Sequence, residues 1–413
     1  MTRSAHQLPA YALFASLLAA AGLPIYIHAP KFFVDEYGVS LGALGTVLFA
    51  LRLLDVVQDP LLGRLSQALR HRRGAAVAVG VALMAVSMFA LFAVPPLLPP
   101  LMWFALTLTG VFSAFSFLTI CFYAQGVAKA AQLPGRGHLV LARWRETGAL
   151  LGVCAASVLP VMLGLVMGAP FTGFAIGFAA LGLGSVFAMR GEWRGADIAG
   201  PTGIAVVLRD PIARRLLLIA LFNAAPVAVT STLFLFYVES VLRAPGWAGA
   251  LLLLFFLSAA VAAPLWGKLA ERFSPKPVLL SAMGLAILVF AGTLLLGAGD
   301  VAWFVLVCIA SGAVLGADLT LLPAMFSARM AVVAPQAAEG FGLWSLVSKF
   351  ALAFAAITLL PTLQASGFDS GTTGNGPVAI STLIWLYAGV PCGLKLLAIG
   401  FLAATPMQKD DEE

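Results

Sequence analysis

Long apolar segments, each followed by a short polar one, repeat along the chain from Leu8 to Ala404. A helix needs about 20 apolar residues to cross the hydrocarbon core of a membrane. Twelve segments are long enough, at residues 8–29, 40–66, 75–94, 101–124, 141–164, 170–189, 214–238, 246–270, 277–297, 300–326, 340–362 and 379–404. The pattern predicts an all-α membrane protein with twelve transmembrane helices and no soluble catalytic domain.

Composition and charge agree with this prediction. Hydrophobic residues make up 61% of the 413 residues and charged residues only 10%, against roughly 25% charged in an ordinary soluble domain. Most of the 24 Lys and Arg fall in loops on one side, whereas only Lys31 and Arg243 fall in loops on the other. By the positive-inside rule, we expect a multi-pass protein of the inner plasma membrane with both termini in the cytoplasm. The net charge of +6 then reports topology and not a nucleic-acid partner.

The chain divides into two similar halves. The longest polar gap, at residues 190–215, separates a six-helix half at 1–190 from a second at 214–413, joined by a cytoplasmic loop at 191–213. A shift of 204 residues superimposes Pro60, Gly63, Arg64 and Leu65 on Pro264, Gly267, Lys268 and Leu269. A duplicated six-helix half predicts the major facilitator fold, with a solute site between the halves.

Three ionisable residues interrupt the second apolar segment, ALRLLDVVQDPLLGRL. Each of Arg52, Asp55 and Asp59 costs about 2.5 to 3.5 kcal/mol at the centre of a membrane helix. Their spacing places them on one helical face. Two carboxylates one turn apart repel each other, and bound Na⁺ or H⁺ relieves the repulsion. Gln58 adds an amide oxygen to this candidate cation site, while a structural ion pair between Arg52 and Asp55 is the alternative.

Other ionisable residues lie within later apolar segments. Arg145 and Glu146 point to different helical faces, so we expect one of them to enter a central cavity. Asp318 and Lys349 lie at similar depth and either neutralise each other or serve separate roles, with Lys349 occupying the acidic site when the coupling ion is absent. Lys395 is isolated in its segment, and we expect a satisfied or snorkelling lysine there.

The remaining candidates are aromatic, and no motif indicates catalysis. Tyr26, Tyr123 and Trp344 either line a solute cavity or pack in the core. The chain has no P-loop, HExxH or GxSxG motif, so we expect neither an enzyme nor a cofactor.

The segment PKFFVDEYGVSLGALGTVLFALRLLDVVQDPLLGRL, with its pattern R-x-x-D-x-x-x-D-P-x-x-G, resembles the glycoside-pentoside-hexuronide:cation symporters. This family is a branch of the major facilitator superfamily that includes melibiose permease. RETGALLG and EGFGLWSLVSKFALAF carry the likeness into later helices.

The resemblance implies roles for individual residues. Asp55 and Asp59 match the cation-site carboxylates, which also serve as the metal ligands if the ion is Na⁺. Gln58 and Ser116 stand near the positions of two further cation ligands. Arg145 matches an arginine near the sugar, and Lys349 matches a lysine tied to coupling. The two acidic sugar-binding positions are Ala19 and Thr119 here, so a galactoside held by carboxylates is not expected.

The sequence as a whole predicts a monomeric secondary transporter that works by alternating access. Asp55, Asp59, Gln58 and Ser116 would bind Na⁺ or H⁺, with Lys349 and Arg52 in coupling. Contacts to a small polar solute, a sugar or glycoside, are assigned to Arg145, Glu146, Thr119, Tyr26, Tyr123, Trp344 and Asp318. The alternatives are a proton-coupled exporter or lysolipid carrier of the same fold, and a non-transporting membrane assembly factor.

Overall fold

The computed structural model describes residues 7–133, 136–193, 203–334, 338–368 and 375–406, and all secondary structure in these ranges is helical. Nine of the described helical segments are long and apolar enough to cross a membrane. Together with the segment that holds α1 (Leu8–Ala20) and α2 (Leu23–Tyr37), with α3 (Leu41–Ala68) and with α13 (Ala338–Ala365), they account for the twelve predicted segments. The all-α fold is therefore confirmed.

The chain forms two compact units. Unit 1 comprises residues 1–208 and 327–346, and unit 2 comprises residues 209–326 and 347–412; residue 413 is grouped with unit 1. The boundary near residue 208 falls in the predicted central loop. The end of α12 (Val301–Val333) and the start of α13 belong to unit 1, whereas the predicted division at 191–213 assigns them to the second half.

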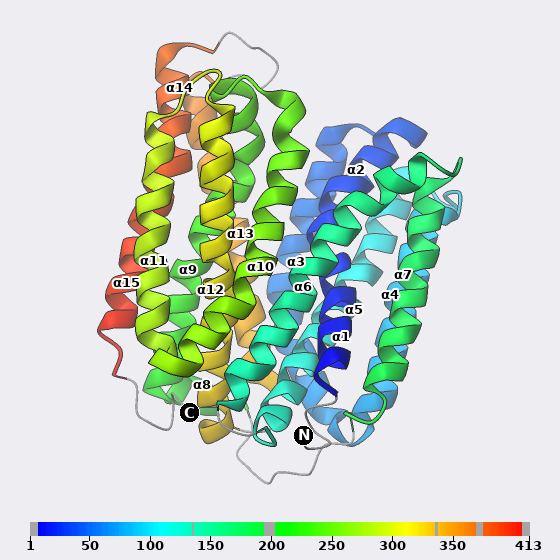
Figure 1. Ribbon diagram of the computed structural model, residues 1–413. Helices are drawn as coiled ribbons and strands as arrows, with labels where there is room; N and C mark the ends of the chain where they lie inside the picture. The colour runs from blue at the N-terminus through cyan, green and yellow to red at the C-terminus, as the bar shows by residue number, and fades with distance from the viewer. Residues whose placement is uncertain (1–6, 134–135, 194–202, 335–337, 369–374, 407–413) are drawn as a thin grey trace. The chain divides into compact units, whose positions relative to one another are not determined.

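Unit 1 is built from the N-terminal helices (Figure 1). These are α1 (Leu8–Ala20), α2 (Leu23–Tyr37), α3 (Leu41–Ala68), α4 (Arg73–Ala93), α5 (Pro100–Ala130), α6 (Gly137–Gly164), α7 (Pro170–Met189) and the short α8 (Ile204–Arg209), whose last residue belongs to unit 2. The prediction of one unbroken helix at 8–29 is wrong. The chain turns at Ala21 and Gly22, and a new helix begins with a proline in its first turn, where no backbone N–H is required.

Small residues bring α6 close to α1. The hydroxyl of Ser16 donates a 2.6 Å hydrogen bond to the carbonyl of Gly148. A Cβ atom at Gly148 would lie 2.2 Å from the carbonyl oxygen of Ala12, and one at Gly152 would lie 2.5 Å from that of Ser16. Glycines one turn apart therefore set the position of α6, and with it the position of Arg145.

A buried ionic cluster joins the ends of three helices of unit 1. Lys129 at the end of α5 lies 2.9 Å from Glu192 beyond α7, and Tyr11 of α1 donates a 3.1 Å hydrogen bond to the same carboxylate. The amide of Gln125 donates to the carbonyl of Glu192 at 2.6 Å. Every charge in the cluster has a partner, which favours a structural role.

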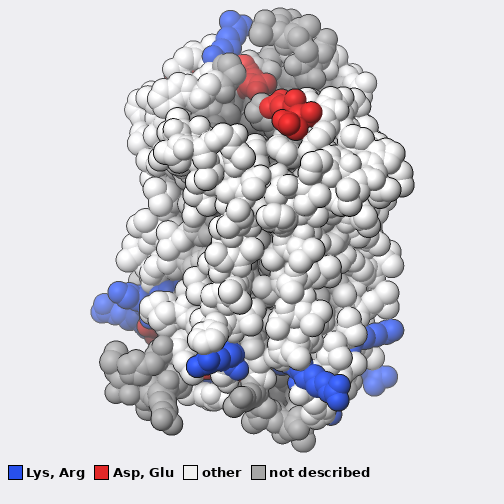
Figure 2. Space-filling view, turned by 90° about the vertical axis from the view of Figure 1, so that its right-hand side faces the viewer, with Lys and Arg blue, Asp and Glu red and all other residues white. Residues whose placement is uncertain are grey.

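The surface of unit 1 matches a membrane environment. Figure 2 shows a broad field of uncharged side chains over α4 and α7, with most of the Lys and Arg gathered at one end. Large apolar side chains on these helices are exposed, among them Val79, Val86, Leu183 and Phe187. Such a surface is suited to lipid and not to water.

Unit 2 contains α9 (Pro211–Phe236), α10 (Ala248–Phe273), α11 (Pro275–Ala291), α12 (Val301–Val333, to Phe326), α13 (Ala338–Ala365, from Val347), α14 (Pro377–Ile384) and α15 (Val390–Ala403). Two π-helical turns, Tyr237–Val241 and Trp385–Gly389, interrupt the regular helices. The rings of Tyr237 and Tyr387 stack 4.2 Å apart, and the Tyr237 hydroxyl donates to the carbonyl of Thr293 at 2.7 Å. The two π turns thus meet in the core of this unit.

Candidate functional site

Two carboxylates of α3 are buried inside unit 1. Asp55 is 2% exposed and Asp59 is 0% exposed. The amide nitrogen of Gln58 donates a 2.8 Å hydrogen bond to Oδ1 of Asp55. Its amide oxygen accepts a 2.9 Å hydrogen bond from Ser113 of α5. Gln58 therefore contacts Asp55 through its amide nitrogen, whereas its amide oxygen, the group expected to bind the cation, accepts from Ser113.

The start of α13 reaches the second carboxylate. Ser345 donates a 2.7 Å hydrogen bond to Oδ2 of Asp59, and both residues belong to unit 1. A Cβ atom at Gly342 would lie 3.1 Å from the carbonyl oxygen of Asp59, so the two backbones approach closely there. Carboxylate, amide and hydroxyl oxygens are the ligand types that hard cations take in proteins. The carboxylates of Asp55 and Asp59 are oxygen donors of this kind.

Arg145 and Glu146 form the centre of a second polar group in unit 1. Nε of Arg145 donates to Oε1 of Glu146 at 2.7 Å, and the Tyr123 hydroxyl donates to the same oxygen at 3.3 Å. The guanidinium carbon lies 3.9 Å from the centre of the Tyr123 ring. The prediction that Arg145 and Glu146 point to separate faces is wrong, because the long arginine stem turns its head group back to the neighbouring carboxylate.

Buried donors in and beside this group have no hydrogen-bond partner among the described residues. They are Nη2 of Arg145 and the hydroxyls of Thr119 and Thr147. Arg145 is only 5% exposed, and Thr119 lies one turn before Tyr123 on α5, on the same helical face. Buried polar groups in native proteins are nearly always paired, so such donors need an explanation. A hydroxyl or carboxylate of a bound solute would satisfy them.

The start of α13 also contacts this second group. The ring of Phe341 lies 5.6 Å from that of Tyr123. Phe341 and Ser345 are one turn apart, so they share a face of α13. Within unit 1, one helical turn therefore contacts Tyr123 through Phe341 and Asp59 through Ser345.

The other predicted site residues are placed as follows. Ser116 is fully buried on α5, three residues after Ser113. Trp344 is half-buried on α13, and Lys349 is buried on the same helix in unit 2. Tyr26 lies in α2 and Arg52 in α3, with side chains outside the described part of the structure.

The partner of Asp318 is Lys395. In unit 2 its Oδ2 forms an ion pair with Lys395, whose ammonium also donates a 2.6 Å hydrogen bond to Oδ1 of Asn223. The interpretation that Asp318 and Lys349 neutralise each other is wrong, whereas Lys395 is a satisfied lysine, one of the two outcomes expected for it. Both members of the pair lie in apolar helices, where an unpaired charge is costly. Their place in apolar segments indicated that each needs a partner, but not which partner.

The chain matches one family model over nearly its whole length. The model is described as MFS/sugar transport protein and covers residues 9–409. No curated protein matches the chain.

Solved structures share the fold at low sequence identity. A bacterial homologue of the iron transporter ferroportin, in an outward-facing state, has a TM-score of 0.71 and 17% identity, covering 97% of this chain and 99% of its own. The Escherichia coli fucose:proton symporter has a TM-score of 0.68 and 11% identity, covering 98% of this chain and 100% of its own. With the helical architecture and the buried acidic face of α3, the match establishes that the chain belongs to the MFS/sugar transport protein family of the major facilitator superfamily.

Proposed function

We propose that this protein is a cation-coupled secondary transporter that carries a small polar solute, a sugar or glycoside, together with Na⁺ or H⁺ across the inner plasma membrane. Its family and fold are those of transporters, which supports secondary transport as the class of activity. The finer assignment depends on the two polar groups of unit 1. In this assignment the carboxylates of α3 hold the coupling ion, and the group around Arg145 holds the solute.

The observation that carries the proposal is the double contact of α13. Ser345 donates to Asp59 at 2.7 Å, and Phe341, one turn earlier, packs on Tyr123. An ion bound at Asp59 competes with the Ser345 hydroxyl for the same carboxylate oxygen. Any shift of Ser345 moves Phe341 on the same rigid turn, and hence the ring under the Arg145 guanidinium. This linkage supplies the differential contact that coupling requires.

The solute chemistry follows from the groups that lack partners. Arg145 and Thr119 present buried hydrogen-bond donors, and Tyr123 presents an aromatic ring. The charge of Arg145 is balanced by Glu146 at 2.7 Å, so the local net charge is near zero. An uncharged polyhydroxylated solute fits this balance, since its oxygens accept from the donors while the ring covers an apolar face.

Lys349 and Arg52 complete the proposed coupling machinery. Lys349 follows Ser345 by one helical turn on α13 and is buried. We assign it the role of competing with the coupling ion. Arg52 precedes Asp55 by three residues on α3, and we assign it the role of a second coupling residue.

The test is a solute screen on the purified protein in proteoliposomes. Charge movement is recorded on addition of sugars, glycosides, uronic acids and lysolipids, with and without Na⁺, at two pH values. The proposal predicts a response to an uncharged sugar or glycoside that requires Na⁺ or low pH. A response only to lysolipids favours the lipid carrier, solute efflux driven by proton entry favours the exporter, and no response to any solute favours the assembly factor.

A further inference from the structure

Unit 2 contains a polar group of its own that the proposed transport steps do not use. Lys395 of α15 pairs with Asp318 of α12 and donates to Asn223 of α9 at 2.6 Å. Lys395 is 5% exposed and Asp318 is 6% exposed. Three helices of one unit thus meet at a buried ion pair.

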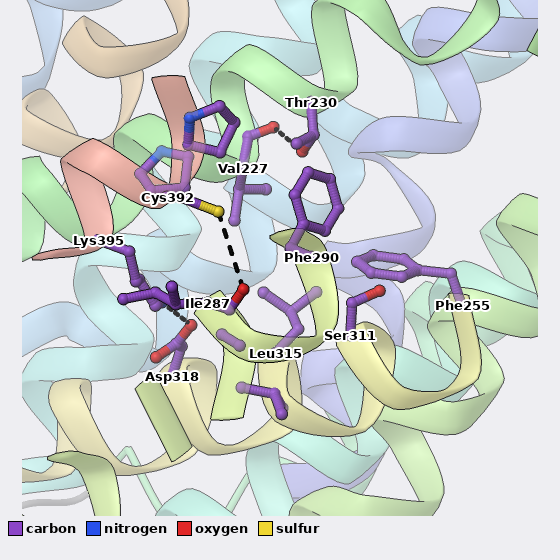
Figure 3. A pocket seen from close by; sticks show the side chains of 14 residues that line it. Val227, Thr230, Phe255, Ile287, Phe290, Ser311, Leu315, Asp318, Cys392 and Lys395 are labelled. Carbon is purple, nitrogen blue, oxygen red and sulfur yellow. Dashed lines mark hydrogen bonds and ion pairs between the residues drawn. The ribbon is translucent and has the colours of Figure 1, made fainter. Parts of the chain in front are cut away.

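A cavity of about 80 Å³ adjoins this pair. Figure 3 shows Asp318 and Lys395 at one end of it and the rings of Phe255 and Phe290 toward the other. The remaining wall is mostly apolar, formed by Pro226, Val227, Ala286, Ile287, Val314, Leu315 and Pro391. A mostly apolar wall with a few polar groups at one end is the usual form of a small-molecule site.

Apart from the Lys395 ammonium, which donates to Asn223 and Asp318, the polar side chains at the cavity include three that can accept hydrogen bonds. Oδ1 of Asp318 is buried and has no hydrogen-bond partner among the described residues. The hydroxyl of Ser311 already donates to the carbonyl of Val307 at 2.6 Å, and that of Thr230 donates to the carbonyl of Val227 at 3.1 Å. Both hydroxyls therefore offer only lone pairs. A ligand that pairs with Oδ1 of Asp318 must therefore bring a hydrogen-bond donor.

The charge balance indicates an uncharged ligand. The carboxylate of Asp318 and the ammonium of Lys395 cancel, so a cation would meet the ammonium and an anion would meet the carboxylate. Moving either ion out of water without a counter-charge is costly. A neutral donor meets the free oxygen of Asp318 without this cost.

We propose that this cavity binds a small uncharged molecule that carries a hydroxyl group on an apolar body, with the hydroxyl donating to Oδ1 of Asp318. The cavity volume is about half of the roughly 150 Å³ that accommodates benzene in an engineered protein cavity. The hydroxyl end therefore occupies the part of the cavity next to Asp318, and the apolar body extends toward Phe255 and Phe290. This site is separate from the transport site of unit 1, so its test does not depend on the identity of the transported solute.

The test uses fluorinated probes on the full chain in lipid nanodiscs. 4-Fluorobenzyl alcohol and the smaller 2,2,2-trifluoroethanol carry the hydroxyl, and 4-fluorotoluene is the matched probe without it. Fluorine NMR line broadening is titrated, and empty nanodiscs correct for partition into lipid. We expect saturable binding of at least one alcohol. If that alcohol is 4-fluorobenzyl alcohol, it should bind at least about tenfold more tightly than 4-fluorotoluene, because a hydrogen bond to a charged group contributes that much.

Two variants locate the binding. Ser311→Leu fills the cavity and leaves the ion pair intact, so it should abolish saturable binding. Ser258→Leu is the matched control, because Ser258 also donates to a carbonyl of its own helix, at 2.8 Å from that of Leu254, but does not line the cavity. The double variant Asp318→Asn with Lys395→Met removes both charges together, and we expect it to weaken alcohol binding at least about tenfold.

The proposal is overturned by any of three results. The first is that neither alcohol binds saturably to the wild-type protein, which would leave water as the occupant. The second is that the bound alcohol binds equally well to the Ser311→Leu and Ser258→Leu variants, which would place it elsewhere. The third is that the double variant binds that alcohol as tightly as the wild type, which would show that the carboxylate does not recognise the hydroxyl.

Discussion

The ion pair of Asp318 and Lys395 gives the sharpest test of the side-chain arrangement in unit 2. Both residues are about 95% buried, so removing one partner leaves an uncompensated charge in an apolar helix. Breaking a buried pair in this way costs about 3 to 5 kcal/mol of unfolding free energy, whereas replacing both partners by neutral groups of similar volume costs far less.

The structure also predicts an order between the two single variants. In Asp318→Asn the ammonium of Lys395 keeps its 2.6 Å hydrogen bond to Asn223, so the loss should lie near the lower value of about 3 kcal/mol. In Lys395→Met the carboxylate of Asp318 keeps no hydrogen-bond partner among the described residues, so the loss should lie near 5 kcal/mol.

The assay is a double-mutant cycle on the free energy of unfolding in mixed micelles, with each variant checked for helicity. The double variant should lose at least about 2 kcal/mol less than the sum of the two single losses. Lys349→Met is the control, since the loss in its double variant with Asp318→Asn should equal the sum within about 0.5 kcal/mol. The assignment is refuted if Asp318 couples to Lys349 and not to Lys395.

Three further predictions concern unit 1. In His71→Cys the new thiol should react with a membrane-impermeant reagent only from the cytoplasmic side, and in Leu97→Cys only from outside. The reverse pattern would overturn the predicted topology. Gly148→Ala should lower the free energy of unfolding by about 1 to 3 kcal/mol, because its Cβ would lie 2.2 Å from a carbonyl oxygen of α1. Gly177→Ala is the control and should not lower it, because the space around Gly177 is open. Equal losses in the two variants would contradict the close packing of α1 and α6. Arg145→Lys removes the planar head group that lies 3.9 Å from the centre of an aromatic ring. The affinity for the solute should therefore fall at least about tenfold, while ion binding to the solute-free protein is unchanged. Parallel losses of solute and ion binding would refute a solute contact at Arg145.

Local patterns made most of the helices predictable. Apolar length fixed their number and approximate bounds, and the spacing of Asp55 and Asp59 placed both on one face of α3. The break at Ala21 and Gly22 was missed because the apolar run continues through it. A proline in the first turn of a new helix was the only signal there.

Contacts between distant segments were not predictable in the same way. Asp318 and Lys395 are 77 residues apart, and Ser345 is 286 residues from Asp59. No spacing rule relates residues on different helices, so a sequence shows that a buried charge needs a partner without showing which one. Arg145 illustrates a second limit, because the position of its Cβ did not indicate where its flexible stem would place the guanidinium.

Coupling at the α3 carboxylates is the central claim, and gradient-driven uptake tests it most directly. Proteoliposomes containing the wild-type protein, Asp55→Asn or Asp59→Asn receive an imposed Na⁺ or pH gradient, and accumulation of the responding solute is measured alongside exchange without a gradient. Both variants should stay folded, and their gradient-driven accumulation should fall to the level without a gradient. Full accumulation by both single variants would contradict the assignment of Asp55 and Asp59 to the coupling ion.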